Sequence, residues 1–307
     1  MKLVAIVNAG AGSVTGSDSA ALRSALSSAF AKHGIEADLL LVKGEEIRAT
    51  AERALADARG RRIDAVAAGG GDGTIRTVAE VLAGSGVPLA VLPLGTLNHF
   101  AKDLGVPDVD SAVAIIAAGA TRSVDLGEVN GEIFINNSSL GIYPYLVADR
   151  ERQTAETGRA KWIAAALAFF RVLRRFPIRR LAVDVGGGAA PIRTPCLFIG
   201  NNEYQLTPRA LGQRETMDRG ELWLCIAVQR DPLRLLWLAF RLIVGFADPS
   251  KDLATAHVTQ AEIRSRASRL PVALDGEVVV MGPPLRYRSR PGDLVVFAPA
   301  PMPTGKP

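Results

Sequence analysis

Residues 63–74 read IDAVAAGGGDGT, an apolar run that leads directly into a glycine-rich turn. Residues 63–68 have the composition of a buried β-strand, and apolar residues recur at helical spacing after Thr74. We predict a strand, a turn and a helix, with Thr74 capping the helix. Glycines allow backbone N–H groups to approach an anion closely, and the helix dipole favours negative charge there. The stretch therefore predicts a phosphate-binding turn.

Asp72 is the unusual member of this turn, because a carboxylate repels phosphate unless a cation lies between them. Mg²⁺, bound directly or through water, is the cation that suits such a group. The alternative is a local role, in which the glycines serve the turn geometry and Asp72 caps a backbone group. The spacing matches neither the Walker A nor the dinucleotide-binding pattern, so the turn alone favours the local role.

A second polar turn follows the next predicted strand. Residues 92–101 read LPLGTLNHFA, and Asn8 ends the first predicted strand. Parallel strands place all of these segments at the carboxyl edge of one sheet, where ligands bind in open α/β folds. Three polar segments on one rim indicate a ligand site rather than ordinary loops.

The order of elements divides the chain in two. Predicted strands at 3–7, 38–42, 63–68 and 89–93 alternate with helical patterns, which predicts a parallel sheet covered by helices in residues 1–125. Short strands separated by turn residues dominate residues 126–300, which predicts an antiparallel β-sandwich or barrel. Helical insertions are expected around 160–175 and 231–246. Residues 301–307 are expected to form a disordered tail.

Composition narrows the classes of partner. The formal net charge of +5 suits nucleotides, anionic lipid surfaces or nucleic acid, but the 6% aromatic content does not suit base stacking, so no nucleic-acid partner is predicted. Cys196 and Cys225 lie in apolar runs and are predicted to be reduced core thiols, without structural zinc. The N-terminal apolar run is too short for a signal peptide, so a cytoplasmic protein is expected.

The two glycine turns together support a resemblance. GGGDGT at 69–74, followed by PLGTLNHFA at 93–101, resembles the catalytic domain of the diacylglycerol kinase family, which includes lipid kinases and sphingosine kinases. NAD kinases and phosphofructokinases belong to the same superfamily. Asp125 and the triplet Asp275-Gly276-Glu277 also lie where the family has matching motifs. The resemblance covers nearly the whole chain and implies an α/β domain, a β-sandwich domain and an active site in the cleft between them.

The resemblance also implies ATP, Mg²⁺ and roles for individual residues. It makes Glu277 the general base for the lipid hydroxyl, and Asp72 the organiser of Mg²⁺ with Asp125 nearby. The residues expected to contact the nucleotide or its phosphates are Asn8, Gly70, Gly71, Gly73, Thr74, Thr96 and Asn98. Without the resemblance, Glu277 is better interpreted as a surface glutamate after an Asp-Gly hairpin turn.

Three positions leave alternatives open. Ala9 stands where the family usually has proline, which affects only local rigidity. His99 stands where many members have aspartate, and it is either part of the site or simply a residue at a helix start. Asp218, before Arg219 and Gly220, lies near the place of a structural Mg²⁺ in similar proteins, although an ordinary acidic turn is the favoured interpretation.

A lipid acceptor requires contact with a membrane. Residues 162–173 and 233–246 are apolar and lie beside arginines, but neither is long or uncharged enough to span a bilayer. Each is either a helix lying in the membrane interface or a core helix of the β-domain. We expect a cytoplasmic protein attached peripherally to the inner face of the membrane, and a homodimer is left open.

The sequence thus predicts a lipid kinase that phosphorylates diacylglycerol or a related lipid alcohol. One alternative is a soluble kinase similar to NAD kinase. The other is an inactive, membrane-associated regulatory protein, for which His99 is the only support. Retention of Asp72, Asp125 and Glu277 argues against loss of catalysis.

Overall fold

The computed structural model describes the chain except for residues 11–15, 142–177, 208–209, 230, 245–251 and 300–307. It divides into two compact units: Met1–Leu126 together with the chain from Pro291 onward, and Gly127–Arg290. The predicted helix around 160–175 and the predicted tail at 301–307 lie outside the described residues. Among the described helices, none is both long and apolar enough to cross a membrane.

The first unit is built on a parallel sheet. Its strands follow the spatial order β2-β1-β3-β4, and every neighbouring pair is parallel. The bounds are β1 (Lys2–Asn8), β2 (Glu36–Val42), β3 (Ala65–Gly70) and β4 (Leu89–Pro93). Val7 pairs with Gly69 and Gly70 with Pro93, so the carboxyl ends of β1, β3 and β4 meet at one edge. The predicted parallel α/β arrangement is confirmed.

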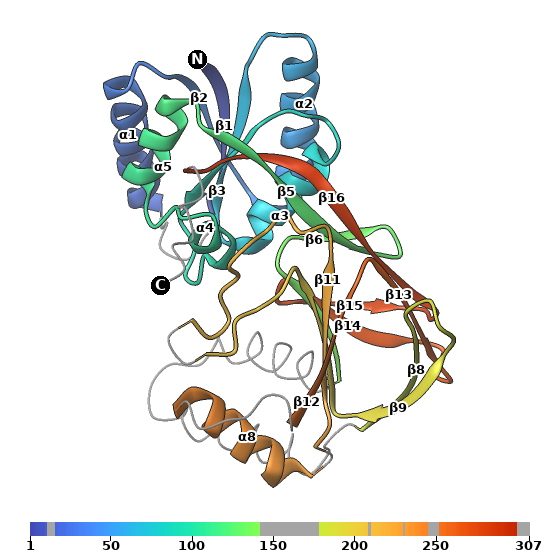
Figure 1. Ribbon diagram of the computed structural model, residues 1–307. Helices are drawn as coiled ribbons and strands as arrows, with labels where there is room; N and C mark the ends of the chain where they lie inside the picture. Colours follow the sequence, from blue (N-terminus) through green and yellow to red (C-terminus); the bar gives the residue numbers. More distant parts are fainter. Residues whose placement is uncertain (11–15, 142–177, 208–209, 230, 245–251, 300–307) are drawn as a thin grey trace. The chain divides into compact units, whose positions relative to one another are not determined.

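Helices cover both faces of this sheet. Figure 1 shows α1 and α5 on one face and α2 on the other. The helical segments are α1 (Gly16–Lys32), the 3-10 turn η1 (Gly44–Glu46), α2 (Ile47–Arg59), α3 (Asp72–Leu82), α4 (His99–Asp103) and α5 (Val109–Ala118). The periodicity of α3 is as expected, since it buries Ile75, Val78, Ala79 and Leu82.

The start of α3 corrects one prediction. The N-cap residue is Gly71, so Thr74 lies inside the first turn and its predicted role as the cap is wrong. The side chain of Thr74 is 6% exposed and is engaged by Asn8 from β1, so it cannot fold back onto the helix start.

The C-terminal part of the chain pairs with the first unit. β5 (Thr121–Val129) and β16 (Leu285–Phe297) each run across the division between the units. Val296 of β16 pairs in parallel with Leu89 of β4, and the Ala298 N–H donates to the Ala120 carbonyl at 3.1 Å. Residues 291–299 therefore belong with the first unit, although the sequence placed them in the second domain. Nothing local in the sequence signals this return, because the pairing partners lie about two hundred residues earlier.

The second unit is an antiparallel β-sandwich, as predicted. One sheet has the order β12-β11-β10-β7-β14-β15, and the other has the order β16-β13-β8-β9, in which the beginning of β16 pairs with β13. The strand bounds are β6 (Glu132–Phe134), β7 (Asn137–Gly141), β8 (Arg179–Asp184), β9 (Ala190–Thr194), β10 (Cys196–Asn201), β11 (Leu222–Ala227), β12 (Leu253–Val258), β13 (Gln260–Ser265), β14 (Leu270–Leu274) and β15 (Glu277–Met281). One helix, α8 (Pro232–Val244), follows β11.

Both sheets of the second unit contribute to one core. Leu181 and Ile263 come from one sheet, and Leu197, Leu222 and Val272 come from the other. Alternate residues of each strand point into this core, which is the packing of a sandwich. The core fixes the hairpin between β14 and β15, which carries Glu277.

Candidate active site

The two glycine turns of the first unit are in direct backbone contact. A Cβ placed on Gly95 would lie 2.4 Å from the Gly71 Cα and 2.9 Å from the Gly71 nitrogen. A Cβ on Gly70 would lie 2.6 Å from the Thr74 Oγ1. Real Cβ atoms do not approach that closely, so these positions require glycine for space. The turn after β3 and the turn after β4 therefore form one continuous surface at the carboxyl edge of the sheet.

The N-terminus of α3 lies at this surface. Its N-cap residue, Gly71, has no side chain that could bond the first-turn N–H groups. A Cβ on Gly71 would meet only the Gly95 Cα, at 3.7 Å, within the 4 Å around it. The first-turn N–H groups point outward at a helix N-terminus, and together with the positive end of the helix dipole they favour phosphate oxygens there. The geometry suits the predicted roles of Gly71 and Gly73.

Asn8 connects the end of β1 to this turn. Its Nδ2 donates to the Thr74 Oγ1 at 3.1 Å, and its Oδ1 accepts the Gly10 N–H at 2.9 Å. Both ends of the amide are therefore used to hold neighbouring backbone and side chain in place. The structure brings Asn8 and Thr74 together, as the sequence predicts for one rim; their contact with a nucleotide stays a prediction.

Asp72 links the first turn to the second. Its Oδ2 accepts the His99 N–H at 3.1 Å and its Oδ1 accepts the Phe100 N–H at 3.0 Å. His99 and Phe100 begin α4, so Asp72 places a negative charge at the start of that helix, where the dipole favours it. The local capping role is thus present. A carboxylate oxygen can accept more than one bond, so capping is compatible with Mg²⁺ binding.

The second turn is held by Asn98. This residue is in the left-handed conformation at φ 51°, and its side chain bonds Gly95 twice, accepting the N–H at 3.0 Å and donating to the carbonyl at 2.8 Å. Thr96 is exposed between them. Asn98 therefore shapes the turn, and Thr96 presents a hydroxyl to solvent. His99 is also exposed, with its N–H bound by Asp72, which fits the interpretation of a residue at a helix start.

Asp125 is buried in the first unit. It is 1% exposed, and its Oδ1 accepts the Gly292 N–H at 2.8 Å. Gly292 lies within β16 and has φ 61°, in the region that favours glycine, so this bond fixes the strand where it enters the first unit. The recorded bond gives Asp125 a structural role. A place beside Asp72 in an acidic network stays a prediction.

A magnesium ion fits this site without a cage of protein ligands. Within the described ranges, no group of three or more His, Cys, Asp or Glu side chains is placed to hold a metal. Mg²⁺ is usually bound by one or two carboxylates together with phosphate oxygens and water. Asp72, which follows Gly71 at the start of α3, could serve as such a carboxylate.

Glu277 ends a tight hairpin in the second unit. Asp275 and Gly276 have φ 48° and 90°, the two positive values of a two-residue turn, and Leu274 pairs with Glu277 across it. Glu277 is exposed. The structure thus places the predicted base at the accessible end of a strand pair that is anchored in the core.

Asp275 is the residue in this motif to which the sequence assigned no role. Its carboxylate accepts the N–H groups of Ile135, Asn136 and Asn137 at 2.8, 2.7 and 3.0 Å. Buried Arg214 binds the other side of the same segment, with 2.8 Å bonds to the Ile135 carbonyl and the Asn136 Oδ1. The hairpin that carries Glu277 is therefore fastened to a rigid segment. The Asp-Gly pair signals the turn, but no pattern signals Arg214.

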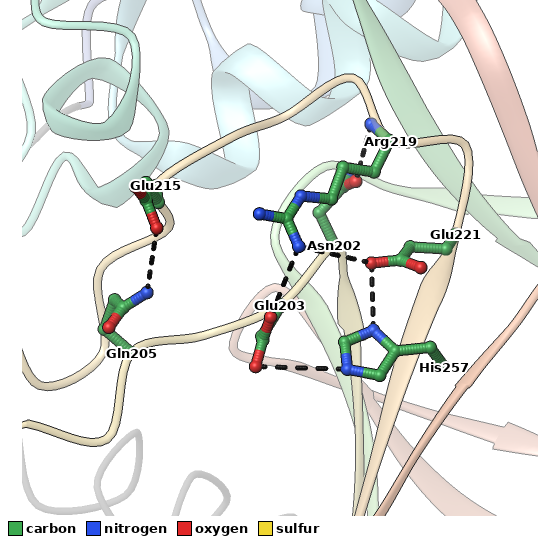
Figure 2. Close-up of polar contacts among 7 residues, drawn as sticks. All are labelled: Asn202, Glu203, Gln205, Glu215, Arg219, Glu221 and His257. Carbon is green, nitrogen blue, oxygen red and sulfur yellow. Dashed lines mark hydrogen bonds and ion pairs between the residues drawn. The ribbon is translucent and has the colours of Figure 1, made fainter. Parts of the chain in front are cut away.

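The loop around Asp218 contains a positively charged side chain, that of Arg219. Figure 2 shows the Arg219 guanidinium beside two carboxylates, 3.5 Å from Glu203 and 4.0 Å from Glu221. His257 contacts the same pair, with Nδ1 2.9 Å from Glu221 and Nε2 3.9 Å from Glu203. Asp218 itself is exposed. The charge of Arg219 is thus shared between Glu203 and Glu221, which suits an ordinary acidic turn. The metal at Asp218 stays a prediction.

Sequence relatives share most of the chain. A 32% identical protein of Pseudomonas fluorescens, named a probable lipid kinase YegS-like, matches 77% of this chain and 78% of its own length. A 33% identical protein of Pseudomonas aeruginosa with the same name matches 77% of each. A diacylglycerol kinase of Mycobacterium tuberculosis is 35% identical over 42% of this chain and 44% of its own.

Solved structures share the fold. A putative diacylglycerol kinase from Bacillus anthracis superimposes with a TM-score of 0.72 at 22% identity, covering 98% of both chains. Another diacylglycerol kinase structure from the same organism gives 0.67 at 20% identity, also with 98% coverage. Residues 2–129 match the model of the diacylglycerol kinase catalytic domain, and they contain both glycine turns and Asp125. The chain therefore belongs to the diacylglycerol kinase catalytic-domain family of lipid kinases.

Proposed function

We propose that this protein transfers the γ-phosphate of ATP, in a Mg²⁺-dependent reaction, to the hydroxyl of diacylglycerol or a related lipid alcohol. The observation that carries the proposal is the contact between Gly71 and Gly95, which joins two turns into one anion-accepting surface. Family membership supports a phosphotransferase, and the named relatives are lipid kinases.

The residues of the first unit bind and orient the nucleotide in this proposal. First-turn N–H groups of α3 hold phosphate oxygens, and the absence of a side chain at Gly71 lets those oxygens approach. Asn8 and Asn98 hold the surrounding backbone in shape. Such a site acts chiefly by positioning, because phosphoryl transfer requires little covalent chemistry from the protein.

The metal supplies charge neutralisation between the phosphates when it is bound. Asp72 would hold it, directly or through water. The same carboxylate accepts two N–H bonds from α4, which fixes its orientation before any ligand arrives. A preorganised carboxylate needs no rearrangement when the nucleotide binds.

Glu277 is the proposed general base. Its carboxylate accepts the proton of the lipid hydroxyl as that oxygen attacks phosphorus, which is the role of a base in alcohol phosphorylation. Exposure gives the carboxylate access to a substrate, and the Asp275 bonds hold the hairpin that carries it.

The test is phosphate transfer to defined acceptors. Purified protein is incubated with γ-labelled ATP, Mg²⁺ and separate acceptors: diacylglycerol, monoacylglycerol, ceramide, sphingosine and NAD. Label in a lipid phosphate supports the proposal and identifies the acceptor. Label in NAD with none in the lipids contradicts it and favours the soluble-kinase alternative. Binding of ATP in calorimetry, without transfer to any acceptor or to water, favours an inactive protein.

A further inference from the structure

Helix α8 exposes a cluster of large apolar side chains. Leu233, Trp237 and Phe240 are 67%, 60% and 54% exposed. Spacings of four and three residues place them on one side of the helix. Single exposed apolar residues are ordinary on a protein surface, but three on one helical side are not. We call these three residues, together with Arg234, the α8 face.

Residues beside the exposed apolar side chains anchor α8 to the second unit. Leu238 is 3% exposed, and Arg241 forms an ion pair with Asp252 at 3.2 Å. The rings of Trp237 and Phe240 stack on each other, with centroids 5.4 Å apart. The orientation of the helix is therefore fixed by its buried side, and its aromatic pair is presented to the exterior as a preformed unit.

Near the α8 face, the charges of Asp231 and Arg241 are engaged by neighbouring groups, whereas the guanidinium of Arg234 is exposed. The Asp231 carboxylate accepts the N–H groups of Leu233 and Arg234, both at 3.0 Å, so its charge is used at the helix N-terminus. The charge of Arg241 is met by Asp252. The exposed guanidinium of Arg234 lies beside the apolar stripe, where it is complementary to anionic headgroups.

We propose that the α8 face docks onto an anionic lipid bilayer, with Trp237, Phe240 and Leu233 entering the boundary between headgroups and acyl chains. Tryptophan beside aliphatic residues and arginine is the composition of helices that lie in this boundary. The inference rests on the proposed function, since an enzyme that phosphorylates a membrane lipid must reach it there. Thirteen residues cannot span the bilayer, so the helix lies flat.

A second copy of the chain is the competing occupant, and the small area of the α8 face favours the bilayer. The three apolar side chains expose an area on the order of 400 Å². A stable protein interface buries about 800 Å² per partner, from about 20–30 residues on each side. Insertion into a bilayer has no such minimum, because each apolar side chain contributes separately.

Vesicle sedimentation tests the proposal. Full-length protein is mixed with vesicles of phosphatidylcholine containing one quarter phosphatidylglycerol, and separately with pure phosphatidylcholine. We expect Trp237→Ser/Phe240→Ser to lower the partition coefficient at least about tenfold on both. Arg234→Ser should lower it a few-fold on the anionic vesicles alone. The control is Val185→Ser/Leu211→Ser, two exposed apolar residues outside α8, which should bind as the unaltered protein does.

The fluorescence of Trp237 reports directly on the α8 face. Trp223 is buried, so in a Trp162→Phe variant the emission that responds to vesicles comes from Trp237. A blue shift and quenching by brominated acyl chains are expected. Sedimentation of the double serine variant equal to that of the unaltered protein, with the same melting temperature, overturns the proposal.

Two further measurements separate the alternatives. If the double variant changes a dimer to a monomer in analytical ultracentrifugation and still binds vesicles, the face belongs to a second copy and the proposal fails.

Kinase activity is also measured with short-chain diacylglycerol below its critical micelle concentration. The double variant should retain this activity while losing activity on vesicles. Vesicle binding through the face without phosphorylation of any lipid contradicts the proposed function but supports the docking face.

Discussion

The carboxylate of Asp72, in the first glycine turn, accepts the backbone N–H of Phe100, in the second, across 3.0 Å. The two residues are 28 positions apart in the chain, and the bond fixes the start of α4 against the start of α3. The carboxylate that we propose to bind the metal therefore also links the two turns through hydrogen bonds. Substitution of Asp72 should therefore change stability as well as activity, and a matched control separates the two effects.

Asp72→Asn should lower the rate of phosphoryl transfer at least about 100-fold, because the charge that holds Mg²⁺ is lost. The amide oxygen still accepts one N–H, so the melting temperature should fall by only a few degrees. The matched control is Asp108→Asn, which alters an aspartate that caps α5 by accepting the Ser111 N–H at 2.8 Å. Equal losses of activity in both variants would show that Asp72 acts through helix capping alone.

Glu277→Gln should lower the transfer rate by about 10²–10⁴-fold without loss of stability, since it removes a proton acceptor from an exposed position. The chain offers a close control in Glu132. That residue follows the turn Asn130-Gly131, with φ 49° and 92°, and pairs with Val129 just as Glu277 pairs with Leu274. Glu132→Gln should retain full activity. Full activity in Glu277→Gln instead would exclude it as the base.

Asp275→Ala should destabilise the protein by about 2–4 kcal/mol, because three backbone N–H groups lose a charged acceptor. Asp275→Asn should cost less, since the amide oxygen can replace the Oδ1 that binds Asn136 and Asn137. Urea unfolding measures both values. Both variants should also lower kcat and leave the KM for lipid nearly unchanged, since the hairpin positions Glu277. Identical unfolding midpoints for Asp275→Ala and the unaltered protein would contradict the structural role.

Gly95→Ala should separate the two turns, because the added Cβ would lie 2.4 Å from the Gly71 Cα. We expect a loss of about 1–3 kcal/mol of stability, as for overpacked sites, and at least about tenfold weaker ATP binding in calorimetry. Gly44→Ala is the control in the same unit, since a Cβ there has nothing within 4 Å. ATP affinity that is unchanged in Gly95→Ala would show that the contact between the turns does not shape the nucleotide site.

The two thiols should make the protein less stable in alkali. Burial raises the pKa of Cys196 to about 11 and, together with the nearby Cys196, that of Cys225 to about 12. Raised values mean that the folded state holds these protons more tightly than the unfolded state. The stabilisation is therefore complete below the ordinary thiol pKa near 9 and is lost as the pH rises through 11.

Urea unfolding at pH 8, 9, 10 and 11 measures this loss. The double variant Cys196→Ala/Cys225→Ala should show a smaller decline above pH 9 than the unaltered protein. The native thiols should also react with Ellman's reagent at pH 8 only as fast as the protein opens. Immediate reaction of both thiols in the native state would contradict their burial.

The sequence by itself determined the parallel α/β order, the β-sandwich that follows, and the glycine turn at residues 69–74. These features depend on hydrophobic periodicity and on the backbone freedom of glycine, both of which are readable within about ten residues. The resemblance carried by GGGDGT and PLGTLNHFA identified the family correctly. The nucleotide, the metal and the lipid acceptor at that site stay predictions.

Only the tertiary structure decided which polar groups hold the site together. Asp275 binds Asn136 across 139 positions, Asp125 binds Gly292 across 167, and Asp72 binds the start of α4. No local pattern encodes these bonds, because the partners lie 28, 139 and 167 positions apart and meet only once the strands have paired. The glycine turn is thus specified locally, whereas the contacts of Asp72 and of the hairpin that carries Glu277 are set by tertiary packing.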